Sequence, residues 1–164
     1  MTRYIRRLCT RRLRDSKGST LVEAAILTPL LVFLTFAIVD FATIFYVYLA
    51  LENGIGAASR YAITGNQAND PNNPGSQLTR EDSIKKAMRD ATPTLTLGDG
   101  AFTFNHLAVG GSTWLGGIGN ENEIGKVTVQ YTWDVMTPLM RPFFPNGQAS
   151  LRVESAMKNE GRFN

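Results

Sequence analysis

The chain has 164 residues, of which 43% are hydrophobic and 19% are charged, so it fits either one ordinary domain or one small domain with an additional element and is not a disordered polymer. Its net charge of +3 comes from a basic N-terminus, and because nucleic-acid binding would depend on that short segment alone, we expect no nucleic-acid partner. The one cysteine, Cys9, excludes a disulfide within the chain and a cysteine-based zinc site.

Residues 1–18 form a basic leader. Seven of the 17 lysine and arginine residues precede Gly18, where Asp15 is the one acidic residue, and the rest of the chain is mildly acidic. Basic residues that flank a membrane span stay in the cytoplasm. We therefore expect the leader to be cytoplasmic and residues 52–164 to form an extracytoplasmic domain.

An apolar run follows at residues 24–51, and Asp40 is the one charged residue in it. About 20 apolar residues cross a bilayer. The run holds sixteen Leu, Ile, Val or Phe residues, which together favour insertion by on the order of −7 kcal/mol, against about +3 kcal/mol for a central Asp. The sequence therefore predicts a transmembrane helix over residues 19–51.

Asp40 lies about 24 Å along this helix from Ala24, close to the far interface of a hydrocarbon core of about 30 Å. Tyr46 and Tyr48 follow, where an interfacial aromatic belt is expected. Acidic residues inside a membrane are often functional. Two interpretations of Asp40 therefore stay open, a near-interface residue and a functional one.

A secretory signal peptide is a poor alternative, because its apolar core has about 7–15 residues and ends in a small-x-small cleavage site. Here the run is longer, and Tyr48-Leu49-Ala50 is a poor site. An uncleaved membrane anchor remains as the alternative.

The sequence around Gly18, Ser19 and Glu23 resembles a prepilin peptidase site, in which a Gly is followed five residues later by a Glu, between a basic leader and an apolar helix. The resemblance implies cleavage between Gly18 and Ser19, with Glu23 as the fifth mature residue. A buried carboxylate needs a positive partner. In pilin-like assemblies that partner is thought to be the freed N-terminal amine.

A wider stretch, residues 18–62, resembles the TadE-like family, the pseudopilins of tight-adherence (Flp-type) pilus systems. The residues that carry the resemblance are Glu23-Ala24-Ala25, Pro29, Asp40 and the segment Ala57-Ala58-Ser59-Arg60-Tyr61-Ala62. The family implies a prepilin peptidase, other pilin or pseudopilin subunits and the pilus assembly machinery as partners. Pro29, Asp40 and Arg60 become candidate residues for assembly or packing.

Each of these residues also has a plain structural interpretation. Gly18 can be a hinge before a helix, and Glu23 can be a solvated residue at its start. Pro29 should remove one backbone hydrogen bond and bend the helix.

The C-terminal part predicts a pilin-like α+β domain. The long N-terminal helix should continue through Ala62, and a second helix should cover residues 80–91. Alternating segments predict a hairpin of residues 94–97 and 101–104, then strands at 126–133 and 149–153, which gives an antiparallel sheet of three or four strands. Residues 110–125 are expected to form a glycine-rich loop that carries Trp114. Residues 136–147 form an apolar, proline-broken loop that either packs on the domain or presents a contact surface.

No catalytic constellation is visible, because His106 is the only histidine. We expect no enzyme activity, no cofactor and no metal, although calcium binding and plain solvation are both open for Asp99, Glu121 and Glu123. The sequence thus predicts a minor pilin or pseudopilin that contributes to an adhesive Flp/Tad-type pilus from the inner membrane. An uncleaved, single-span extracytoplasmic binding protein is the alternative.

Overall fold

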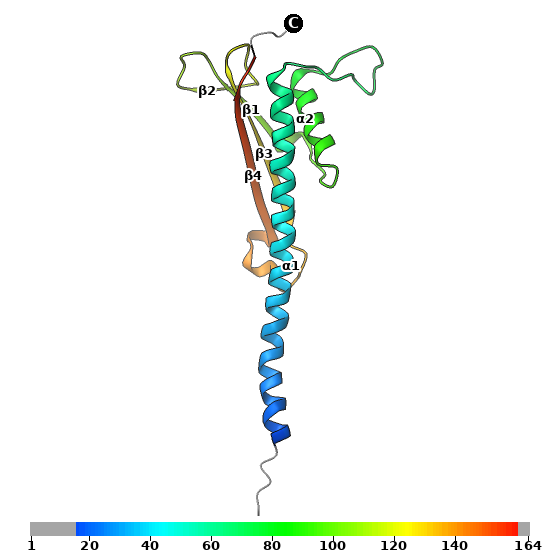
Figure 1. Ribbon diagram of the computed structural model, residues 1–164, viewed down its shortest axis with the longest axis vertical. Coiled ribbons are helices and arrows are strands. Elements are labelled where there is room, and N and C mark those ends of the chain that lie inside the picture. The colour runs from blue at the N-terminus through cyan, green and yellow to red at the C-terminus, as the bar shows by residue number, and fades with distance from the viewer. Residues whose placement is uncertain (1–15, 161–164) are drawn as a thin grey trace, which may run out of the picture.

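In the computed structural model, residues 16–160 are described, and α1 (Ser16–Ile63) is one uninterrupted helix of 48 residues. The basic leader as far as Asp15, with Cys9, lies outside the described residues. In Figure 1 the first part of α1 projects alone from the molecule, whereas its second part is packed within a small domain. The predicted continuation of the helix through Ala62 is confirmed.

The domain adds one further α-helix and a sheet to the second part of α1. Its elements are α2 (Arg80–Ala91), β1 (Phe102–Leu107), β2 (Trp114–Gly116), β3 (Ile124–Asp134) and β4 (Gln148–Lys158). The sheet has the order β2-β1-β3-β4, and every neighbouring pair is antiparallel. The predicted α+β fold, with a long N-terminal helix, a second helix and a sheet of three or four strands, is confirmed.

The core lies where α1 meets the sheet on one side and α2 on the other (Figure 1). On β3, Val127 and Val129 are buried, and Tyr131 and Trp133 pack against the same core, as the alternation of that strand predicted. The same helix that projects from the domain therefore also supplies one wall of its core. The buried core residues from α1 and α2 are Val47, Leu51, Ile55, Ala58, Ala62, Ile84 and Met88.

Gly54 allows α1 and α2 to approach closely. A Cβ atom at this position would lie 2.5 Å from Cγ2 of Thr92, which is closer than two carbon atoms can pack. Gly54 therefore costs helix propensity but lets the end of α2 pack directly on the backbone of α1. The partner in this close contact is the C-terminal end of α2.

Two expectations are wrong, the strand at residues 94–97 and the loop position of Trp114. Residues 94–97 do not form a strand: Leu95 and Leu97 point into the core, but the carbonyl of Leu97 accepts a hydrogen bond from Nε of Arg89 at 2.9 Å, and β1 begins only at Phe102. Trp114 does not lie in a loop, since it begins β2 and pairs with Leu107 of β1. Alternation alone does not distinguish a strand from a segment that places every second residue on a core.

Candidate assembly site on the N-terminal helix

The projecting part of α1 exposes large apolar side chains around its circumference. Leu21 is 71% exposed, Ile26 70% and Phe41 70%. An exposed apolar surface of this extent marks a site that contacts lipid or protein. The helix is long and apolar enough to cross a membrane. We therefore treat this surface, together with the candidate residues that lie along it, as the functional site.

The processing residues lie at the start of this helix. Gly18, Ser19 and Glu23 are all exposed, and an added Cβ at Gly18 would meet no atom within 4 Å. Ser19 and Glu23 are four residues apart in α1, so they lie on one face, one turn from each other. An amine freed at Ser19 would therefore lie within a turn of the Glu23 carboxylate of the same chain. Cleavage after Gly18 stays a prediction.

Pro29 lies inside α1, and the helix continues through it without a break. Proline at this position removes the hydrogen bond that its N–H would donate to the carbonyl four residues earlier, at Ala25. Both residues are exposed, so this carbonyl faces the surroundings of the helix. Any packing role of Pro29 therefore concerns partners outside the chain.

Asp40 is the one candidate residue that the fold buries, with 2% of its surface exposed. Its Oδ1 atom accepts a hydrogen bond from the backbone N–H of Thr137 at 3.3 Å, and its Oδ2 atom accepts one from the Thr137 hydroxyl. A buried carboxylate is stable only when such donors replace water. Asp40 is therefore a structural contact between α1 and the loop that follows β3, 97 residues later in the chain.

Thr137 was not predicted as a functional residue. The signal in the sequence was indirect: an apolar loop with three prolines offers few polar groups, and Thr137 is one of them. The turn that begins at Thr137 presents its N–H and its hydroxyl in the same direction, so that both reach one carboxylate. A contact of this kind depends on how the loop folds and not on a local sequence pattern.

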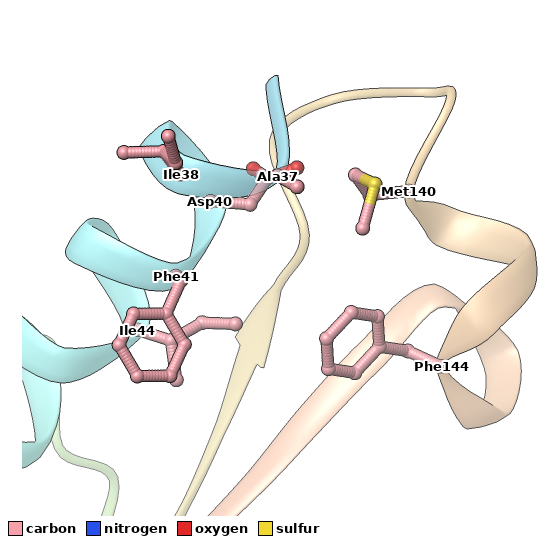
Figure 2. A pocket seen from close by; sticks show the side chains of 7 residues that line it. All are labelled: Ala37, Ile38, Asp40, Phe41, Ile44, Met140 and Phe144. Carbon is pink, nitrogen blue, oxygen red and sulfur yellow. The ribbon is translucent and has the colours of Figure 1, made fainter. Parts of the chain in front are cut away.

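The loop and α1 enclose an apolar groove of about 390 Å³ next to Asp40. Figure 2 shows Phe41 and Ile44 of α1 on one side and Met140 and Phe144 of the loop on the other. Phe143 reaches further toward the N-terminus of α1, where its ring lies edge-on to that of Phe33, with 5.9 Å between the ring centroids. The loop thus packs on α1, as one of the two expectations stated, and it also exposes apolar side chains. That these side chains form a contact surface stays a prediction.

Arg60 is exposed in the last turn of α1, where a cation is favourable to the helix dipole. It lies 20 residues from Asp40, which is about 30 Å along the helix, so the fold does not bring these two candidates together. Arg80 is the arginine that the fold uses at this end. Its guanidinium donates to the carbonyls of Ala62 at 2.9 Å and Gly119 at 2.7 Å, and burial lowers the pKa of Arg80.

Two of the three acidic residues in the glycine-rich loops, Asp99 and Glu123, have partners within the domain. Asp99 pairs with Arg89 at 2.6 Å, which lowers the pKa of Asp99, and Glu123 accepts the backbone N–H of Asn120 at 2.6 Å. Within residues 16–160 no group of three or more His, Cys, Asp or Glu side chains is placed to hold a metal ion.

The candidate residues lie within a segment of the chain that matches the model of a known protein family. The model of the family described as TadE-like protein matches residues 18–60. This stretch of the chain is similar to that family. It begins at Gly18 and ends at Arg60, so it contains Ser19, Glu23, Pro29 and Asp40 and stops before α2 and the sheet. Neither a curated protein nor a solved structure gives a significant match. The TadE-like segment is therefore the helix that links the exposed apolar surface to the domain core.

Proposed function

We propose that this chain is a TadE-like minor pilin or pseudopilin, a non-catalytic subunit that contributes to assembly of an adhesive Flp/Tad-type pilus. The TadE-like match supports an association with Tad pilus systems. The observation that carries the proposal is the form of α1: one end is apolar and exposed, and the other end is built into the domain core. A helix of this form anchors the domain in the inner membrane before assembly and packs against neighbouring helices afterwards.

Membrane and fibre make different demands on Glu23. In the membrane the residue lies at the cytoplasmic end of the helix, where water can solvate its carboxylate. In a bundle of pilin helices the carboxylate is surrounded by apolar side chains and needs a positive partner. The amine of Ser19, freed by prepilin peptidase and one turn away, is such a partner in the same or a neighbouring subunit. A wrongly staggered neighbour would leave both charges unpaired, so this pair fixes the axial register.

The proposed topology follows from charge. The leader stays in the cytoplasm, α1 crosses the inner membrane once, and the sheet and α2 lie outside. The alternative, an uncleaved single-span binding protein, has the same topology but a different N-terminus. Sequencing the N-terminus of the membrane-extracted protein distinguishes the two, because the pilin begins at Ser19 and the uncleaved anchor begins at Met1 or Thr2.

Two substitutions test the proposal in cells. Gly18→Leu should block cleavage, because the peptidase must fit the residue before the cut, and mass spectrometry should then find the full-length chain. Glu23→Ala should leave insertion and cleavage intact but reduce the number of surface pili. Glu52→Ala, at another exposed acidic position of α1, is the matched control and should leave piliation normal. Normal piliation and processing in Glu23→Ala would show that Glu23 has no role in assembly.

A further inference from the structure

The loop of residues 136–144 exposes its apolar side chains although it lies at the base of the domain, beside α1 (Figure 1). Met136 is 59% exposed, Leu139 46% and Phe143 67%. The loop contains one charged residue, the exposed Arg141, and no acidic residue. Soluble domains seldom leave three large apolar side chains of one short loop in water.

The position of the loop along α1 indicates what covers it. Thr137 is bonded to Asp40, and Phe143 contacts Phe33, which is seven residues and therefore about 10 Å nearer the N-terminus. If the hydrocarbon core begins as early as Ser19, a core of about 30 Å ends near Asp40. Phe33 and Phe143 then lie roughly 10 Å inside it. A later start of the core, at Ala24, would place the loop deeper still.

We propose that the loop of residues 136–144 is a second membrane-contacting element, which inserts its exposed apolar side chains among the acyl chains of the outer leaflet beside α1. This inference rests on the proposed function, because it requires α1 to span the membrane. The loop lies outside residues 18–62, the segment that resembles the family, so this attachment to the membrane does not follow from the resemblance. The domain is thereby held to the bilayer at two points, the helix and the loop.

Five of the six N–H groups between Thr137 and Phe144 have a partner within the protein, as a lipid environment requires, and Leu139 is the exception. Between Thr137 and Phe144, the N–H of Thr137 is bonded to Asp40, and four further N–H groups are bonded within the loop. Pro138 and Pro142 have no N–H to satisfy. The four bonded within the loop are those of Met140, Arg141, Phe143 and Phe144.

The polar groups of this region are placed where a membrane interface tolerates them. Asp40 is turned away from the surroundings of α1, since its carboxylate is covered by Thr137. Arg141 is exposed, and its Nε donates to the carbonyl of Val135 at 3.1 Å, so part of its hydrogen-bonding capacity is used within the protein. The exposed apolar face of the loop is also continuous with that of α1, because Phe41, which is 70% exposed, lines the same groove as Met140 and Phe144. Lipid acyl chains therefore fit this surface better than a partner that would have to recognise the loop alone.

Site-specific fluorescence in vesicles tests the inference. In the full-length Cys9→Ser chain, single cysteines are introduced as Leu139→Cys, Met136→Cys, Val39→Cys and Val109→Cys, and each is labelled with the fluorophore NBD. The proteins are reconstituted, at a high lipid-to-protein ratio, into phosphatidylethanolamine–phosphatidylglycerol vesicles that carry nitroxide groups on their acyl chains. Val39 reports the helix, and Val109, which is 74% exposed in the turn between β1 and β2, reports the far end of the domain.

We expect the labels at Leu139 and Met136 to show blue-shifted emission and a loss of intensity to nitroxide similar to that at Val39, with little loss at Val109. Strong loss at Val39, with Leu139 and Met136 behaving like Val109, would overturn the loop contact and leave the membrane anchor intact. A blue shift at Leu139 without loss to nitroxide would also overturn it, because protein would then cover the loop. No loss at Val39 would instead contradict the membrane-spanning helix of the proposed function.

Discussion

The contact between Asp40 and Thr137 should contribute measurably to the stability of the domain. Thr137→Val keeps the shape of the side chain but removes the hydroxyl that donates to the buried carboxylate. Hydrogen bonds to charged groups contribute about 1.5 to 3 kcal/mol, and the loss is not offset by water because Asp40 is 2% exposed. The unfolding equilibrium constant should therefore rise by roughly ten- to a hundredfold, and Tm should fall by roughly 3 to 10 °C.

Thermal unfolding of the full-length chain in non-ionic detergent, followed by tryptophan fluorescence, measures this effect. Trp133 is a suitable reporter because it lies on β3 four residues before Thr137. Thr137→Ser keeps the hydroxyl and is the matched control, which should be close to the wild-type protein. In the Asp40→Ala background, Thr137→Val should cost little, because the hydroxyl no longer faces a carboxylate. An equal loss from Thr137→Val in both backgrounds would refute the assignment of the hydrogen bond.

Two further predictions concern α2. Gly54→Ala should lower the unfolding free energy by up to about 2 kcal/mol, because the clash with Cγ2 of Thr92 outweighs the gain in helix propensity. Adding Thr92→Ser, which removes Cγ2 but leaves the Met88 contacts at 3.3 and 3.4 Å, should reduce this loss in thermal unfolding. A loss of the same size in both backgrounds would contradict the packing argument. The hydrogen bond from Thr79 lowers the pKa of Asp82 below its ordinary value of 3.8, so its contribution to stability is present above that pH and is lost as the pH falls through the lowered pKa. Unfolding measured over this acidic range should show a smaller loss of stability in Asp82→Asn than in the wild-type protein, and equal slopes would show that Asp82 adds nothing.

The elements that the sequence predicted well are those with a local pattern. The second helix was located at residues 80–91, since Thr79 marks its start and the apolar residues recur at helical spacing. The buried face of β3 followed from the alternation of Val127, Val129, Tyr131 and Trp133. Residues 94–97 have the same alternation without forming a strand, because what a segment pairs with is decided by the rest of the fold.

The candidate site was predicted unevenly for the same reason. The residues along α1 follow each other in the chain, so one motif could indicate them all. The partner of Asp40 lies 97 residues away, and the two meet only when β3 and β4 place the intervening loop beside α1. The composition of this loop could indicate that it is apolar. Its position along α1 could be determined only from the structure.

The continuity of α1 has a mechanical consequence. No hinge separates the exposed part of the helix from the part that is packed against the sheet, since all 48 residues are helical. No flexible linker therefore absorbs a displacement applied to the exposed end, and the displacement reaches the end of α1 at Ile63, about 35 Å beyond Asp40. A rotation of the helix about its axis likewise turns the whole domain by the same angle. Machinery that grips only the helix would thus set both the height and the azimuth of the sheet.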